Sequence, residues 1–257
     1  MTIIFPSPIF GPVQSRRLGV SLGINLLPDD GKFCNFDCVY CECGYNADRR
    51  PRQPLPTREE VRVALERRLK EMKADGPAPD VLTFAGNGEP TAHPRFAEII
   101  DDTLALRDTY FPAAKVSVLS NATFIDRPAV FAALNKVDNN ILKLDTASEE
   151  YIRLVDRPQG KYSVRRTIEG MKAFRGNCVV QTMFLRGTFL GKSVDNTSDH
   201  FVLPWLEAVK EIAPRQVMIY TVDRDTPDHY LLKATPAELD RIAALVTAAG
   251  LDVSVSY

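Results

Sequence analysis

Short apolar runs alternate along the chain with longer segments in which apolar residues recur at helical spacing. The apolar runs are rich in β-branched residues and predict strands at residues 18–27, 80–85, 115–119, 139–144, 178–185, 216–219 and 252–257. Between them, helices are expected at residues 57–73, 94–107, 128–136, 163–174 and 199–212, and after Thr235. Two helix starts carry a capping signal, because Thr57 precedes Glu60 and Thr235 precedes Glu238 with a proline at the first helical position.

The order of these elements predicts the architecture. A strand followed by a helix, repeated six times with short connections, is typical of a parallel α/β fold. Seven strands are too few to close an eight-stranded barrel. Residues 1–17 contain several prolines and a glycine and are expected to be irregular. No linker or low-complexity tract interrupts the pattern, so one domain is expected over residues 1–257.

Composition narrows the class of protein. The chain has 257 residues, a net charge of −1 and 45% hydrophobic residues, which is ordinary for a globular protein. No apolar run approaches the ~18 residues that a membrane span needs, and the first residues do not resemble a signal peptide. A reducing, cytoplasmic location is therefore expected. The charge does not indicate general nucleic-acid binding, although it permits one RNA bound by a local basic patch.

Three of the five cysteines are clustered in one stretch of eight residues. Cys34, Cys38 and Cys41 follow a C-x3-C-x2-C spacing. Thiolates bind soft metals, and three of them would leave one iron of a [4Fe–4S] cluster without a protein ligand. A zinc site with Cys43 as a fourth ligand is an alternative, and chance clustering is another. A disulfide is disfavoured in a chain without a secretory signal.

The cysteine spacing, with Tyr40 just before the last cysteine, resembles the motif of the radical S-adenosylmethionine (radical SAM) family. The resemblance implies a [4Fe–4S] cluster held by Cys34, Cys38 and Cys41 in a loop at about residues 28–48. It also implies S-adenosylmethionine (SAM) bound at the open iron and cleaved to a 5′-deoxyadenosyl radical, which removes hydrogen from a substrate. The implied fold is a partial (β/α)6 TIM-like barrel.

A glycine-rich turn follows the second predicted strand. Gly86 and Gly88 let a ligand approach the backbone closely, and Glu89 can accept a hydrogen bond from an ammonium group. An ordinary strand-to-helix turn is the alternative. The turn resembles the Gly-Gly-Glu-Pro motif of the radical SAM family, which implies that it binds the SAM amino group. Asn87 is the departure from that motif.

Polar residues end the later strands and are expected to converge at one edge of the sheet: Ser120, Asn121, Lys143, Asp145, Gln181, Arg186 and Tyr220. By position they resemble the family's SAM contacts. This implies Ser120, Asn121 and Asp145 near the ribose, and Lys143 or Arg186 near the carboxylate. A structural ion pair or a solvated strand end is the alternative for each. The polar segment at residues 186–198 is expected to be a loop suited to a substrate lid.

A narrower resemblance is to compact bacterial radical SAM oxidoreductases related to the tRNA wybutosine-synthesis enzymes. It is carried by residues 11–19, 34–41, 84–91, 142–145 and 216–220. The favoured substrate is a small molecule or a modified nucleobase, with flavodoxin or ferredoxin as the type of electron donor. The arginines at residues 16–17 and 49–52 would suit a phosphate-bearing substrate or RNA, or form only an exposed basic loop.

Two other functions stay open. One is activation of a glycyl radical or modification of a peptide, and the other is a non-catalytic metal-binding module. The sequence assigns no residue to the abstraction of hydrogen. His93, His200 and His229 lack metal-ligand spacing and are expected at the surface or at helix starts. Cys178 begins an apolar strand and is expected in the core.

Overall fold

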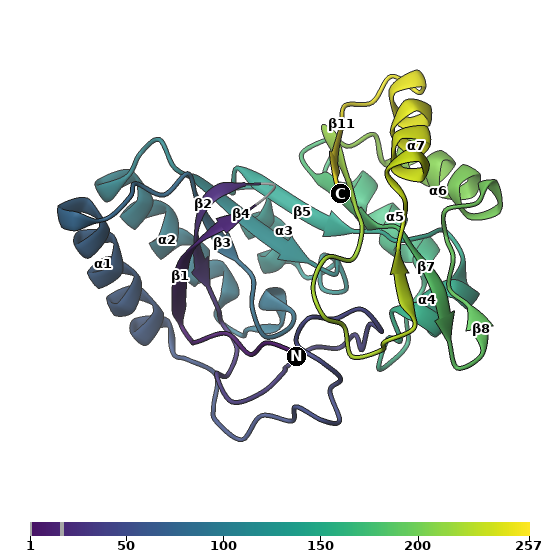
Figure 1. The fold of residues 1–257 in the computed structure, drawn as a ribbon. Coiled ribbons are helices and arrows are strands. Elements are labelled where there is room, and N and C mark those ends of the chain that lie inside the picture. Colours follow the sequence, from purple (N-terminus) through teal and green to yellow (C-terminus); the bar gives the residue numbers. More distant parts are fainter. Residues whose placement is uncertain (1, 16–17) are drawn as a thin grey trace.

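An open, curled sheet forms the centre of the molecule (Figure 1). The computed structural model describes residues 2–15 and 18–257. The sheet has the order β1-β2-β3-β4-β5-β6-β9-β11. Its strands are β1 (Ile9–Ser15), β2 (Gly19–Ile24), β3 (Val81–Phe84), β4 (Lys115–Ser120), β5 (Asn139–Lys143), β6 (Val179–Met183), β9 (Gln216–Tyr220) and β11 (Val253–Ser256).

The strand directions explain why the sheet resembles part of a barrel. All neighbouring strands from β2 to β11 are parallel, and only β1 runs antiparallel, against β2. In the described part of the chain no pairing joins β1 to β11, so the barrel stays open. The predicted α/β fold with a partial TIM-like barrel is confirmed.

Helices pack against the strands and complete the core. They are α1 (Arg58–Asp75), η1 (Pro90–Ala92), α2 (Phe96–Tyr110), α3 (Pro128–Leu134), α4 (Glu149–Val155), α5 (Val164–Lys172), α6 (Asp199–Ile212) and α7 (Pro236–Ala248). Figure 1 shows α1, α2 and α3 together on one side of the first strands. Both predicted capping boxes are present, at Thr57 with Glu60 and at Thr235 with Glu238. One hydrophobic cluster contains buried residues from Leu22 through Val246. That residues 1–257 form a single domain stays a prediction.

The first predicted irregular segment contains a strand. Residues 9–15 form β1, although Gly11 and Pro12 lie within it. The pairing with β2 shifts register between Phe10 and Val13, and β1 is an edge strand. Proline is tolerated at an edge or a bulge because its missing N–H group is not needed there. The expectation of an irregular segment is therefore wrong for residues 9–15.

A second, smaller sheet replaces the predicted lid loop. The expected strand at residues 178–185 is two strands, because Phe184 separates β6 from β7 (Leu185–Phe189). β7 pairs with β8 (Lys192–Ser193) and with β10 (Leu231–Lys233) in the order β10-β7-β8. Residues 186–193 are thus mainly a hairpin rather than a loop. No helix among the described residues has the length and apolarity to cross a membrane.

Candidate active site

The cysteine loop, residues 28–48, follows β2 at the carboxyl edge of the parallel strands. Its backbone is fixed on two sides. On one side Phe33 N donates to Asn87 O at 2.8 Å and Glu89 N donates to Phe33 O at 3.2 Å. On the other side Asp37 N and Val39 N donate to the carbonyls of Asp156 and Val155, at 3.0 and 2.9 Å. The loop is therefore clamped between the turn after β3 and the end of α4.

Gly88 explains how closely the turn after β3 approaches the cysteines. A Cβ atom at this position would lie 2.0 Å from Phe33 O and 3.1 Å from Cys34 Cβ. Its φ of +138° is also in the region that favours glycine. Only glycine lets the two segments share hydrogen bonds here. That Gly88 also lets a ligand approach the backbone stays a prediction.

The three motif cysteines lie in this loop as free thiols, and Cys38 is 9% exposed. Burial raises the pKa of Cys34 to about 12. The hydrogen bond from the Cys43 thiol lowers the pKa of Cys41 to about 6. Within residues 2–15 and 18–257, no three histidine, cysteine or acidic side chains converge into a ready metal site.

The donor set nevertheless fits an iron–sulfur cluster. Three thiols project from one fixed loop at the spacing that such clusters use, and thiolate is their usual ligand. Cys43 is 4% exposed, and its Sγ lies 3.4 Å from Gly86 O. Cys178 is fully buried, as expected for a core residue.

A buried cation stabilises the cysteine loop from within. Lys32 is 3% exposed, and its Nζ donates to Gly44 O at 2.8 Å and to Asp37 Oδ1 at 3.4 Å. Asp37 Oδ2 lies 3.5 Å from Arg157 Nη1, so two cations share one carboxylate. Burial alone would lower the pKa of Lys32, but the nearby thiols and Asp37 raise it above its ordinary value. Sequence reasoning missed this lysine, although it stands two residues before Cys34.

The group of polar residues on the Cys34 side of the loop is built around Glu89, and we name it the Cys34-side group (Asn35, Glu89, Thr91, Ser120 and Asn121). Glu89 Oε1 accepts from Thr91 N at 3.0 Å, from Thr91 Oγ1 at 2.5 Å and from Ser120 Oγ at 2.8 Å. Glu89 Oε2 accepts from Asn121 N at 2.6 Å. Burial raises the pKa of Glu89.

Asn121 connects this carboxylate to the cysteine loop. Its Nδ2 donates to Asn35 Oδ1 at 2.8 Å and to Cys34 Sγ at 3.8 Å. Three predicted site residues, Glu89, Ser120 and Asn121, are therefore brought together beside Cys34 by the ends of β3 and β4. The structure shows the convergence, and their contacts with a cofactor stay predictions.

Asn87 has a structural role in the same turn. It is fully buried, and its Oδ1 accepts from Phe5 N at 2.8 Å. Its Nδ2 donates to Phe5 O at 2.8 Å and to Pro28 O at 2.7 Å. Every polar group of this side chain is satisfied within the protein. The asparagine that departs from the family motif thus anchors the segment before β1 to the turn.

Lys143 and Asp145 meet Tyr40 on the other side of the loop, and with Asp156 they form what we name the Cys38-side group. Lys143 Nζ bonds to Tyr40 Oη and Asp145 Oδ2, and lies 2.5 Å from Asp156 Oδ1. The Tyr40 hydroxyl bonds to Asp145 Oδ2 and reaches Asp156 Oδ1 at 3.3 Å. The carboxyl end of β5, the end of α4 and the cysteine loop thus share one ionic network.

Asp156 is the residue of this group that sequence reasoning missed. It is fully buried at the end of α4, and its Oδ2 has no hydrogen-bond partner in the described structure. Burial raises the pKa of Asp156 to about 6. The helix α4 was not predicted, so nothing in the pattern placed Asp156 near the cysteines. A serine cap followed by two glutamates, at residues 148–150, was the available signal.

Arg186 contacts residues outside both polar groups. It is on β7, where its Nε donates to Lys233 O at 3.0 Å and lies 3.5 Å from Glu238 Oε2. These contacts tie the second sheet to the start of α7.

Arg16 and Arg17 are outside the described residues. His93 is buried rather than at the surface, with Nε2 2.9 Å from Pro56 O.

Comparisons with known proteins agree on one family. The model of the Radical SAM superfamily matches residues 30–196, which is more than half of the chain and includes the three motif cysteines and both polar groups. UPF0026 protein MJ1312 of Methanocaldococcus jannaschii is 30% identical over 241 residues, which is 92% of this chain and 70% of the relative.

Solved structures share the fold. Streptococcus suis SuiB bound to S-adenosylmethionine superposes with a TM-score of 0.64 and 17% identity over 91% of this chain and 50% of SuiB. Archaeal TYW1 has a TM-score of 0.55 and 13% identity over 89% of this chain and 72% of TYW1. The resemblance inferred from the cysteine motif is confirmed. SAM and an iron–sulfur cluster are the cofactors that this family implies, and the chain belongs to the Radical SAM superfamily of enzymes.

Proposed function

We propose that Cys34, Cys38 and Cys41 hold a [4Fe–4S] cluster whose fourth iron binds SAM. The observation that carries the proposal is the position of the three thiols, in one fixed loop between two buried polar groups. The chemistry that such a cluster supplies is one-electron reduction of SAM, which breaks a carbon–sulfur bond and gives a 5′-deoxyadenosyl radical that removes hydrogen from the substrate.

The Cys34-side group is suited to the SAM ammonium group. Glu89 Oε2 accepts one hydrogen bond from the described residues, from Asn121 N, and a carboxylate oxygen has room for a second donor. The turn at Gly86 and Gly88 offers backbone groups close to Cys34. Because the Asn87 side chain and main-chain N–H are already satisfied, only a second hydrogen bond to its main-chain O is available to a cofactor.

The Cys38-side group is suited to the remaining polar parts of SAM. Asp145 and the unpartnered Oδ2 of Asp156 are acceptors for ribose hydroxyls, and Lys143 is a cation for the carboxylate. Tyr40 orients this network through its hydroxyl. Ser120 and Asn121 act through the position of Glu89, and Arg186 is the alternative carboxylate partner from the second sheet.

The proposed substrate is a small molecule or a modified nucleobase, and the proposed electron donor is of the flavodoxin or ferredoxin type. The chain's own residues would bind SAM, exclude water and fix the direction of the radical. Burial of Glu89, Asp145 and Asp156 supports this, because all three are at most 2% exposed.

The test is an anaerobic reconstitution followed by iron and sulfide counting. SAM and dithionite are then added, and 5′-deoxyadenosine is quantified. We expect about four irons per chain and 5′-deoxyadenosine formation that is lost in Cys34→Ala, Cys38→Ala or Cys41→Ala. Cys178→Ala is the matched control and should keep the iron.

Two outcomes separate the alternatives. If the protein binds one zinc ion tightly and loses it when Cys43 is changed, the site is a zinc site and not an iron–sulfur cluster. A cluster that binds without SAM cleavage in the presence of dithionite would support a non-catalytic metal-binding module. Either result would contradict the proposal.

A further inference from the structure

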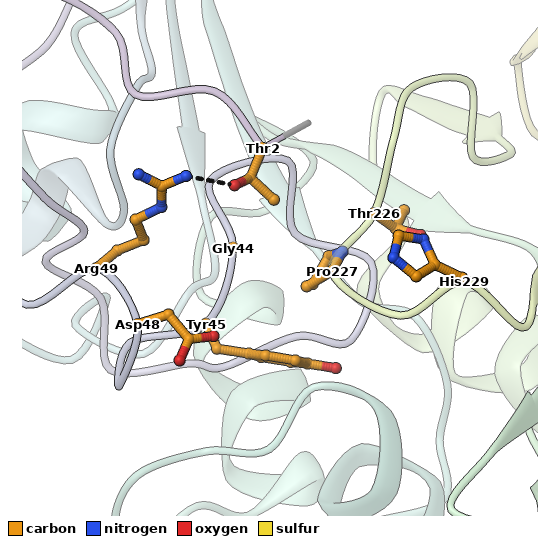
Figure 2. A pocket seen from close by; sticks show the side chains of 8 residues that line it. All are labelled: Thr2, Gly44, Tyr45, Asp48, Arg49, Thr226, Pro227 and His229. Atoms are coloured by element: carbon orange, nitrogen blue, oxygen red, sulfur yellow. Dashed lines mark hydrogen bonds between the residues drawn. The ribbon is translucent and has the colours of Figure 1, made fainter.

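A cavity of about 450 Å³ lies beside the cysteine loop. This open cavity is lined by the segment after Cys41, the start of the chain and the connection between β9 and β10, through Thr2, Gly44, Tyr45, Arg49, Pro227 and His229 (Figure 2). Its volume is within the range of small-molecule sites, about 300–1,000 Å³. None of these six residues belongs to the proposed cofactor site.

The cavity shares a wall with the cysteine loop. Gly44 N donates to Cys41 O at 2.9 Å, and Gly44 O accepts from Lys32 Nζ at 2.8 Å. The opposite wall is tied to the same loop, because Arg224 Nη1 lies 2.7 Å from Glu42 Oε2. A ligand in the cavity would therefore be separated from the cluster site by a single turn of chain.

Arg49 carries free hydrogen-bond donors into this cavity. Its Nη2 donates to Thr2 Oγ1 at 2.9 Å, and its side chain has no carboxylate partner among the residues that the structure describes. Asp48 also lines the cavity, but it is exposed and does not pair with Arg49 in the described structure. Arg49 O accepts from Lys32 N, so the backbone that carries this guanidinium is fixed. A half-buried guanidinium without a carboxylate is a ready partner for a phosphate or a carboxylate.

Tyr45 provides a flat wall. The Arg157 guanidinium lies 5.0 Å from its ring centroid, which supports the ring from the protein side. Its hydroxyl is buried and has no hydrogen-bond partner in the described structure. Figure 2 shows the Tyr45 ring along one side of the cavity, with Arg49 on another and Pro227 and His229 across from it. The hydroxyl has no surface that a ligand in the cavity could reach, so Tyr45 offers a ligand the face of its ring.

We propose that this cavity binds a second small molecule beside the cysteine loop, as a planar ring against Tyr45 with an anionic group on Arg49. This ligand is distinct from the substrate of the radical, because a turn of the chain separates it from the cluster site. The shared chemistry is a flat ring with a phosphate or a carboxylate, and the two anions are distinguished by experiment.

The test uses the reconstituted full-length chain with saturating SAM and isothermal titration calorimetry. The phosphate arm compares adenosine 5′-monophosphate with adenosine, and the carboxylate arm compares benzoate with benzamide. We expect the charged member of at least one pair to bind at least ten-fold more tightly than its neutral partner. Arg49→Gln should remove that difference, and the exposed neighbour Arg50→Gln should preserve it.

A second variant tests the ring contact. Tyr45→Leu should weaken binding of both members of the preferred pair, because both carry the ring. If neither pair discriminates by charge, or if the preference survives in Arg49→Gln, the proposal is wrong. Formation of 5′-deoxyadenosine by the same preparation is scored separately, so failure of this binding site is distinguishable from failure of the radical chemistry.

Discussion

The two polar groups that flank the cysteine loop stabilise their buried carboxylates in different ways. In the Cys34-side group one carboxylate, Glu89, is surrounded by neutral donors from Thr91, Ser120 and Asn121. In the Cys38-side group two carboxylates, Asp145 and Asp156, share the single ammonium of Lys143. The first arrangement disperses charge over several hydrogen bonds, and the second concentrates it on one cation.

This difference indicates which group is held in place without a ligand. Glu89 accepts four hydrogen bonds from Thr91, Ser120 and Asn121, so its position is determined by the fold. Asp156 Oδ2 has no hydrogen-bond partner in the described structure, so the Cys38-side group can still accept a hydrogen bond from a ligand. We infer that the Cys34-side group is rigid in the free protein, and that the Cys38-side group gains most from a bound cofactor.

The largest expected effect comes from breaking the charge balance of the Cys38-side group. Lys143→Met would leave two buried carboxylates without their cation, and loss of one partner of a buried ion pair costs about 3–5 kcal/mol. We expect the free energy of unfolding, measured by urea titration of the protein without cofactors, to fall by about that amount.

Lys136→Met is the matched control, because Lys136 pairs with Asp101 at the exposed surface. Such pairs contribute about 0–1 kcal/mol. Equal effects of the two substitutions would show that the Lys143 network does not carry the stability that its burial indicates.

A smaller effect is expected in the Cys34-side group from Glu89→Gln. The substitution keeps the size of the side chain but turns one oxygen into a donor, which would face the donors of Thr91, Ser120 or Asn121. Hydrogen bonds to a charged acceptor contribute about 1.5–3 kcal/mol each, so we expect a loss of about 2 kcal/mol. Urea unfolding measures it, and weaker SAM binding should accompany it.

Glu98→Gln on the exposed side of α2 is the control for this change, since Glu98 pairs only with the exposed Arg95 in the described structure. If Glu89→Gln unfolds at the same urea concentration as the wild-type protein, the carboxylate is not held as its hydrogen bonds indicate.

The contrast between the groups also explains what the sequence could predict. Glu89 stands in a local motif, and Ser120 and Lys143 end regular strands, so spacing along the chain located all three. Asp156 and Lys32 are single charged residues in irregular or unpredicted segments. Their burial depends on contacts with the cysteine loop that no local pattern encodes.

The elements of the fold divide in the same way, into those that local patterns predicted and those that depend on distant pairing. Long apolar runs and capping boxes predicted α1, α6 and the parallel strands closely. β1 was missed because Gly11 and Pro12 break its pattern, and its strand conformation depends on pairing with β2. The hairpin of β7 and β8 was missed because residues 186–193 are polar and pair only within the small sheet.

One hydroxyl tests how far the charge of Glu89 is dispersed. Ser120→Ala removes the donor to Glu89 Oε1 and the acceptor for Ala122 N, at 2.8 and 3.0 Å. A hydrogen bond to a charged acceptor contributes at least about 1.5 kcal/mol, and the other donors to Glu89 remain. We expect a loss near that value in urea unfolding. A loss as large as that of Glu89→Gln would show that the hydrogen bonds are not shared among the donors. Ser193→Ala, at an exposed position on β8, should have no effect.

The smallest effect is a pH dependence from His93, which lies four residues after Glu89. Burial lowers the pKa of His93. Its Nδ1 accepts from Arg95 N at 3.1 Å and its Nε2 faces Pro56 O, so the folded protein holds the neutral ring. The unfolded chain takes up a proton near pH 6.5, and the folded protein does so only at lower pH.

This histidine therefore contributes nothing to the pH dependence above about pH 7, and its contribution to stability falls as the pH drops below about 6.5. The measurement is urea unfolding of the wild-type protein and of His93→Gln between pH 5 and 8. The wild-type protein should lose more stability than the variant toward pH 5, whereas His200→Gln, at an exposed position, should follow the wild type. Parallel curves for wild type and His93→Gln would mean that the ring is free to take up a proton, and that the segment of His93 is looser than its hydrogen bonds indicate.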